Sequence, residues 1–346
     1  MSKDFGFYFE RAGRSAVQGA TSSDEEHFKD LGMAESLVRE MGQNSLDARA
    51  KSNSGPVHMV FELRDLKVGE IPDWTNLSEH VLAADESTRH IDQANTRLQM
   101  ATEASEWTHL PVLRIGDYGT TGLTGREDDP TNTAPLVALT RARGVSAGKV
   151  DQGGSFGVGA STGALSSAIR TVLWTSWPND GNPPVFAGQS QLATHTLRNE
   201  RYGPDGFFIN KENENFEYLR SSDPVGSFEP RTEFGTDTFI LGYLDSAEDP
   251  DLTAIKDAFV RNFFVAIHRG LLTVEGVTEK SHWRLDAETL ASEIRNYPNV
   301  LPFYIALLNE PFVEEIDGLG TLKLYVEMDE DLPKKLNTIV MRKPLM

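Results

Sequence analysis

Apolar residues recur at three- and four-residue spacings over residues 33–50, where Leu37, Met41 and Ala48 share one face. This spacing matches the 3.6-residue period of an α-helix, so the pattern predicts a helix over residues 33–50. The polar run 51–56 contains glycine and proline and predicts the end of that helix.

Short apolar or alternating runs between turn residues predict a series of β-strands. The expected strands cover residues 57–63, 112–115, 170–176, 185–193, 238–243, 271–277 and 321–328, with a strand-like run at 338–341. Further helices are expected over residues 135–143, 160–168 and 252–268, the last of which is followed by Gly270 as a stop signal.

Five segments need a separate interpretation. Residues 1–32 are polar and mixed, and we expect an N-terminal arm there. Residues 66–108 are acidic and partly helical, which indicates an insertion over the core. Residues 120–152 form a long loop, and long loops in compact domains are usually functional or disordered. Residues 203–233 are rich in turn formers, and a weaker second unit is expected over residues 279–346.

The composition is typical of a globular protein, because 39% of the 346 residues are hydrophobic. A chain of this length is expected to hold one large domain and a second piece. The chain has no run of about 18 apolar residues and no secretory signal pattern, so no membrane span is expected. Cysteine is absent, which excludes disulfides and thiolate metal sites and favours a cytoplasmic location.

The formal net charge is −19. Affinity for the nucleic acid backbone depends on lysine and arginine, so a chain this acidic repels nucleic acid on average. Arg141, Arg143 and Lys149 nevertheless form a local basic patch. The charge therefore disfavours DNA binding without excluding it.

Glu40 and Asn44 carry the first candidate chemistry. They are four positions apart in the predicted helix and so lie on one face, one turn apart. A carboxylate there can accept a proton from a water that attacks phosphorus, and an amide oxygen can ligate Mg²⁺. Asp47 makes the same face more polar. The alternative is an ordinary exposed helix face.

Asp117 follows a predicted buried strand and precedes Gly119. Its carboxylate can accept a hydrogen bond from an exocyclic amine such as that of adenine, and glycine lets the backbone pass close to a flat base. The alternative is an aspartate at a strand end followed by a glycine turn.

The segment Gly153–Gly159 contains four glycines and precedes a predicted helix of small residues. Free backbone amides at such a place attract phosphate oxygens. The segment has neither the Gly-Lys-Ser/Thr ending of a P-loop nor the context of a dinucleotide fingerprint. The alternative is a flexible surface loop.

Together, and in this order, these motifs resemble those of the GHKL ATPase superfamily. This superfamily includes the gyrase B subunit, heat-shock chaperones of the ninety-kilodalton class, histidine kinases, MutL and MORC-type ATPases. The run that starts at Glu40 is similar to its first motif, Asp117–Gly122 to the second and Gly154–Ser161 to the third. The pair Gly235-Thr236 is similar to the fourth. The resemblance spans residues 33–245.

The resemblance implies ATP and Mg²⁺ as ligands, with Glu40 as the general base and Asn44 as the Mg²⁺ ligand. Asp117 would bind adenine with help from Thr236, and Lys343 would belong to a second-domain strand that senses the terminal phosphate. The positions that the resemblance assigns to nucleotide binding are Asn44, Asp47, Asp117, Gly119, Gly122, Lys149, Gly154, Ser155, Phe156, Gly157, Val158, Gly159 and Thr236.

One departure concerns the second motif, which is usually Asp-x-Gly-x-Gly. Here two threonines separate Gly119 from Gly122, so the adenine contact should be kept while the role of Gly122 is in doubt. The Tyr-Gly-Thr-Thr-Gly-Leu form is most similar to prokaryotic MORC-like ATPases, which are associated with DNA processing and phage defence.

The fold that the resemblance implies is a two-layer α/β sandwich of the Bergerat type. It has a mixed, largely antiparallel sheet with helices on one face. The ATP-binding domain would cover residues 33–278, with a lid over 120–152. ATP hydrolysis, lid closure and homodimer formation are implied, with DNA or a defence-system protein as partner. A chaperone-like ATPase and a regulatory module with little turnover are the alternatives. The histidine kinase branch fits poorly, because only His27 precedes the site.

Overall fold

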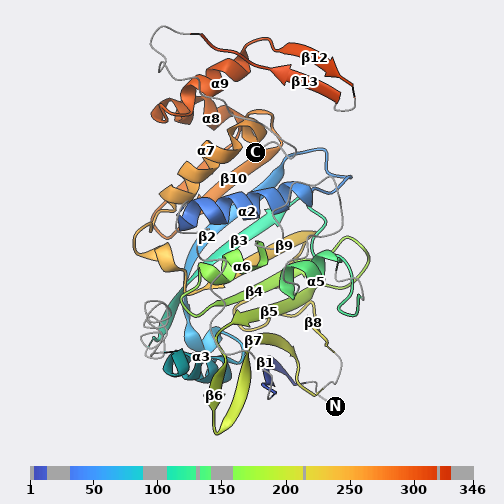
Figure 1. Cartoon of the computed structure of the whole chain (residues 1–346), viewed down its shortest axis with the longest axis vertical. Coiled ribbons are helices and arrows are strands. Elements are labelled where there is room, and N and C mark those ends of the chain that lie inside the picture. The colour runs from blue at the N-terminus through green and yellow to red at the C-terminus, as the bar shows by residue number, and fades with distance from the viewer. Residues whose placement is uncertain are drawn as a thin grey trace.

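An eleven-stranded sheet runs through the computed structural model, which describes residues 4–13, 32–88, 107–129, 133–141, 159–212, 216–317 and 320–328 (Figure 1). The strand order is β1-β7-β5-β4-β9-β3-β2-β10-β11, with β6 beside β7 and β8 beside β5. All pairs of this sheet are antiparallel except β2 and β10, which run parallel. The strands are β1 Phe5–Arg11, β2 Val57–Lys67, β3 His109–Tyr118, β4 Thr171–Trp177, β5 Val185–Gln191, β6 His195–Leu197, β7 Glu200–Asn210, β8 Leu219–Arg220, β9 Gly235–Leu241, β10 Leu272–Val277 and β11 His282–Leu285.

Helices and a separate hairpin complete the described chain. The helices are α2 Met33–Asp47, α3 Trp74–Thr88, α5 Pro135–Thr140, α6 Gly159–Leu165, α7 Thr253–His268, α8 Ala287–Glu293 and α9 Leu301–Leu308. Turns of 3₁₀ helix occupy Val68–Glu70, Leu244–Ser246 and Ile294–Asn296, and β12 Phe312–Ile316 pairs with β13 Gly320–Leu324. Among the helices of the described ranges, none combines the length and apolar character needed to cross a bilayer.

The two faces of the sheet carry different cores, because successive side chains of a strand point to opposite faces. In β3, Leu113 and Ile115 join the core that contains α2 and α7. Leu110 and Val112, at the alternating positions, join a second core with apolar residues of α3. The sequence therefore supplies an apolar residue to both faces along this central strand.

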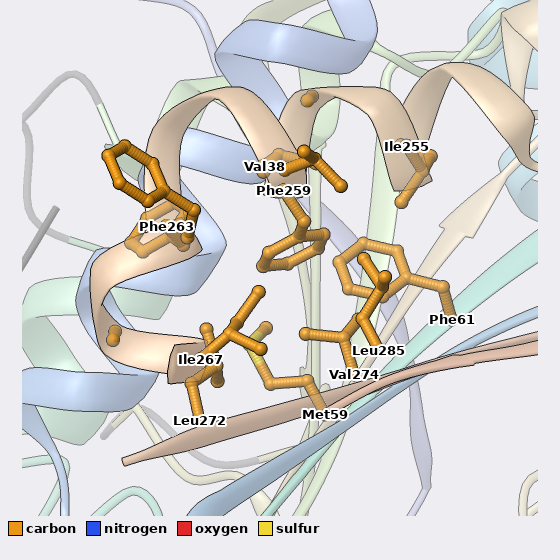
Figure 2. Close-up of a cluster of buried hydrophobic side chains, with 14 of the residues drawn as sticks. Val38, Met59, Phe61, Ile255, Phe259, Phe263, Ile267, Leu272, Val274 and Leu285 are labelled. Atoms are coloured by element: carbon orange, nitrogen blue, oxygen red, sulfur yellow. The ribbon is translucent and has the colours of Figure 1, made fainter. Parts of the chain in front are cut away.

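Helix α2 lies across one face of the sheet and packs beside α7 (Figure 1). Val38 of α2 meets Phe259 and Phe263 of α7 above Met59 and Phe61 of β2 (Figure 2). This packing buries the apolar stripe of α2 and leaves Glu40 partly exposed and Asn44 exposed. The core thus fixes the helix that carries the candidate chemistry.

The fold is the expected mixed α/β arrangement with a largely antiparallel sheet, but α3 adds a layer on the other face. Leu77, Val81 and Ala84 form its apolar stripe, at helical spacing, and share a core with Leu110 and Val112. Residues 74–88 of the segment 66–108 therefore contribute a helix to the far face.

Residues 5–11 form the edge strand β1 rather than part of an irregular arm. The strand pairs antiparallel with β7, and its Phe7 and Phe9 are buried. Strand β7 in turn occupies residues 200–210, part of which was expected to be turns because it contains glycine and proline. Pairing between these distant segments places both in the sheet, and the aromatic residues of β1, which alternate at Phe5, Phe7 and Phe9, suit a strand.

The sheet continues past residue 278, the expected end of the ATP-binding domain. Strand β11 pairs with β10, and Leu290 of α8 and Leu307 of α9 join the same core as α7. The hairpin β12–β13 forms a sheet of its own, with Phe312 exposed. The residues just after 278 are thus continuous with the main sheet.

Two buried histidines join α3 to the β6–β7 hairpin. His80 Nδ1 lies 2.7 Å from His195 Nε2, and His195 Nδ1 lies 2.7 Å from the Ala193 carbonyl oxygen. His195 Nδ1 therefore donates to the carbonyl, and His195 Nε2 accepts from His80. Burial, together with His195 and Arg198, lowers the pKa of His80 to about 4. Burial also lowers the pKa of His195, although its bond to Ala193 opposes this.

The free energy of unfolding should consequently fall at acidic pH. An unfolded histidine has a pKa of about 6.5, so lowering the folded pKa makes protonation favour the unfolded state. His80 should stabilise the fold fully above pH 6.5 and progressively less as pH falls toward 4, with a loss of about 2 kcal/mol at pH 5. Urea denaturation at pH 7.5 and pH 5 measures this loss.

His80→Asn serves as the test variant because its amide nitrogen replaces the Nδ1 donor without titrating. Most of the loss at pH 5 should disappear in this variant. His282→Asn is the control, since the His282 side chain is 62% exposed, and it should behave like the parent protein. An undiminished loss in His80→Asn would contradict the assignment to this pair.

Candidate functional site

The polar face of α2 carries Glu40 and Asn44 one turn apart. Asn44 Nδ2 donates a hydrogen bond to Glu40 Oε1 at 3.0 Å. Asn44 is an exposed residue, and within the described part of the chain its amide oxygen accepts no hydrogen bond. Asp47 is the last residue of α2 and is partly exposed. A carboxylate and an outward amide oxygen thus lie together on this face.

Asp117 lies near the end of β3 and contacts both α2 and β9. Its Oδ1 accepts hydrogen bonds from the Thr236 backbone N–H at 2.9 Å and the Thr120 hydroxyl at 2.6 Å. Its Oδ2 accepts a longer bond, at 3.4 Å, from Ser45 Oγ of α2. Three segments that are distant in sequence therefore meet at one carboxylate, and its Oδ2 atom is the more weakly bonded of the two oxygens.

The environment of Asp117 combines desolvation with hydrogen bonds to the charged form. Burial raises the pKa of Asp117, while the bonds from Thr120 and Thr236 and the charge of Arg231 oppose that rise. Asp237, which lies nearby, raises the pKa further. A further hydrogen-bond donor on Oδ2 would stabilise the charged form of a carboxylate in such a setting.

The loop after Asp117 is tied to the end of α2 by backbone hydrogen bonds. Ala50 N donates to the Gly119 carbonyl at 3.0 Å, and Thr121 N donates to the Ala48 carbonyl at 2.8 Å. These bonds fix the distance between the acidic strand end and the polar face of the helix. Thr121 therefore ties this loop to the end of α2, whereas Thr120 contributes through its hydrogen bond to Asp117.

Gly122, whose role the second motif leaves in doubt, sits where the chain passes close to β4 and β9. Its φ is +65°, and a Cβ atom there would lie 2.6 Å from the Trp177 carbonyl oxygen and 3.1 Å from that of Gly235. Any side chain would therefore displace this loop from the strand ends. The position of Gly122 favours a packing role for this glycine.

The remaining predicted positions are only partly within the described residues. Lys149, Lys343 and the segment from Gly154 to Val158 lie outside them, as does Arg143. Gly159 is the first residue of α6, which packs beside α2. The structure thus brings together the first, second and fourth motifs and describes only the end of the third.

Sequence reasoning missed three contributors to this arrangement. Ser45 is buried and contacts Asp117, and Thr120 donates to the same carboxylate, although both lie inside the recognised motifs. Arg231 is buried and binds the Asp117 backbone, yet it lies in a turn-rich stretch with no pattern to mark it. Only the folded chain places that arginine at the site.

No protein-family model and no curated protein matches this sequence. A topoisomerase IV ATP-binding domain from Francisella tularensis, solved with a small-molecule inhibitor, aligns with a TM-score of 0.39 and 13% identity. The 43K ATPase domain of Thermus thermophilus gyrase B, solved with an aminocoumarin, aligns with a TM-score of 0.36 and 14% identity. The alignments cover 87% and 84% of this chain but only 61% and 56% of those chains. Similarity at this level assigns neither an activity nor a ligand.

Proposed function

We propose that this chain binds Mg²⁺-ATP and hydrolyses it as an ATPase of the GHKL type. The observation that carries the proposal is the meeting of Ser45, Asp117 and Thr236, which sets α2, the helix that carries Glu40 and Asn44, beside an acidic strand end. The sequence motifs to which these residues belong support the same ligand. The largely antiparallel sheet with α2 and α7 on one face, and the order of the motifs along the chain, also support it.

Asp117 would recognise the base. Its Oδ2 has a single long hydrogen bond, so it can accept a shorter one from the exocyclic amine of adenine. Guanine presents a carbonyl at the equivalent position, and two acceptors would then face each other. The site should therefore prefer adenine to guanine nucleotides.

Asn44 and Glu40 would act at the phosphate end. Among the residues that the structure describes, no three histidine, aspartate or glutamate side chains gather into a metal site, so a metal here needs oxygen ligands from the nucleotide. The exposed amide oxygen of Asn44 fits such a shared ion, whose charge would offset that of the phosphates. Glu40, oriented by its bond to Asn44, would accept the proton of the attacking water.

Calorimetry with a non-hydrolysable ATP analogue and Mg²⁺ tests the proposal directly. We expect saturable binding, at least about tenfold weaker binding of the matching GTP analogue, and weaker binding when Mg²⁺ is removed. Folding is checked on the same sample by thermal unfolding. An absence of binding heat from folded protein across several temperatures would refute the proposed function.

The finer assignment rests on the Tyr-Gly-Thr-Thr-Gly-Leu form of the second motif. We place the chain with prokaryotic MORC-like ATPases, in which ATP-driven lid closure and homodimer formation would serve DNA processing or phage defence. Light scattering on the calorimetry sample would then report a doubling of mass when the analogue is present. A constant mass would remove dimerisation from the proposal and leave ATP binding unaffected.

A further inference from the structure

Arg231 is a buried arginine that joins the two strand ends of the candidate site. Its side chain is 3% exposed. Arg231 Nη2 donates to the Asp117 carbonyl oxygen at 2.6 Å, and Nη1 donates to Asp237 Oδ1 at 2.8 Å. The guanidinium also lies over the Tyr118 ring, 4.2 Å from its centroid. One side chain thus holds both β3 and β9.

The position of Arg231 coincides with the end of the β3–β9 ladder. The last backbone pair of that ladder is Gly116 opposite Asp237, so Asp117 and Thr236 come immediately after it. In a continued ladder, the Asp117 carbonyl would take a backbone partner from β9. Here Arg231 binds that carbonyl, and the Thr236 N–H donates to the Asp117 carboxylate.

This exchange of partners sets the direction of the Asp117 side chain. Thr236 N holds Oδ1, and the Oδ2 atom is left toward Ser45 of α2. Without a donor from Arg231, the Asp117 carbonyl would compete for the Thr236 N–H, since a backbone carbonyl that loses its partner inside the fold is costly. The carboxylate would then lose the bond that orients it.

Neighbouring residues are arranged to admit the guanidinium. Gly235 has a φ of +138°, and a Cβ atom there would lie 2.3 Å from the Asp117 carbonyl oxygen and 2.5 Å from Arg231 Nη2. Asp237 also forms an ion pair with Arg114, at 2.8 Å from Nη2, which holds its carboxylate in place. The contact between Arg231 and Asp117 therefore depends on a glycine and on a fixed acid.

We infer that Arg231 is a positioning residue that aims the Asp117 carboxylate at the exocyclic amine of an adenine nucleotide. This inference rests on the proposed function, because it concerns how the same site selects its base. Arg231 contacts no nucleotide itself. Its removal should therefore reduce discrimination for the amine more than it reduces affinity for the sugar and phosphates.

The inference is tested by comparing the affinities of two ligands for the parent chain and for variants of Arg231. ADP and purine riboside 5′-diphosphate differ only in the 6-amino group, and calorimetry with Mg²⁺ gives the affinity ratio for each protein. The parent chain should prefer ADP by about tenfold or more. In Arg231→Met the ratio should fall to about twofold, and Arg231→Lys, which retains a donor, should give an intermediate ratio.

Arg284→Met is the matched control. Arg284 also lies on the main sheet and forms ion pairs with Glu275 and Asp286, but it belongs to β11, remote from β9 in the strand order. The affinity ratio of Arg284→Met for the two diphosphates should equal that of the parent chain. If Arg231→Met does not fold, Arg231→Lys still tests the inference, because its affinity ratio should fall about threefold from the parent value.

The outcomes separate this inference from the proposed function. An unchanged ratio in a folded Arg231 variant overturns the inference, even if affinity for both ligands falls equally, because the arginine then has a general structural role. A parent chain that binds neither diphosphate overturns the proposed function, and the inference with it. A ratio that falls in the Arg231 variants alone supports the inference.

Discussion

Replacing Glu40 with glutamine is expected to lower the rate of ATP turnover at saturation by about 10²–10⁴-fold, the usual effect of removing a general base. Glutamine keeps the size of the side chain and an oxygen that can accept the hydrogen bond from Asn44 Nδ2. It cannot accept the proton of the attacking water. Nucleotide affinity should therefore stay within a few-fold of the parent value, as measured by calorimetry alongside a phosphate-release assay.

Glu35→Gln provides the matched control for this prediction. Glu35 lies on the same helix but pairs with Arg261, at 3.3 Å. Its removal changes the charge of α2 by the same amount without touching the Glu40–Asn44 pair. Turnover that is similar in both variants would show that Glu40 is not the base. A nucleotide-binding chain without turnover in the parent form would instead support a regulatory module.

Replacing Asp117 with asparagine should lower affinity for ATP by about 10–100-fold, since a hydrogen bond to a charged group contributes about 1.5–3 kcal/mol. Oδ1 can still accept from Thr236 and Thr120 when the amide oxygen takes its place. The amide nitrogen then occupies the Oδ2 position and faces the adenine amine as a second donor. Calorimetry with the non-hydrolysable analogue measures the loss.

Asp257→Asn is the control for Asp117→Asn. Asp257 lies on α7 and accepts a hydrogen bond from the Tyr297 hydroxyl at 2.6 Å, so its substitution also changes one bonded carboxylate to an amide. Affinity should not change in this variant. If Asp117→Asn binds ATP with the affinity of the parent chain, this carboxylate does not recognise the base, whatever the stability of the variant.

The two substitutions should also affect different measurements. Glu40 lies one turn from Asn44 on α2, whereas Asp117 lies at the end of β3 and contacts that helix through Ser45. A change at Glu40 should therefore reduce turnover without loss of binding, and a change at Asp117 should reduce binding first. The reverse pattern would mean that Glu40 lies at the base and Asp117 at the phosphates.

The sequence by itself determined the elements whose side chains repeat with a clear period. The helix expected over residues 33–50 is α2, Met33–Asp47, because its apolar stripe is buried against α7. The helix expected over 252–268 is α7, Thr253–His268. Local patterns also marked Glu40 and Asn44, which are four residues apart on the predicted helix, and Asp117, which precedes a glycine turn.

Only the tertiary structure decided which distant segments meet. Strands β1 and β7 pair although they lie far apart in the sequence, and α3 covers the face of the sheet opposite α2. Arg231 had no signal at all, because its role depends on the point at which the β3–β9 ladder ends. Periodicity records how one segment meets a core, whereas pairing partners, strand ends and buried charges depend on residues far away in sequence.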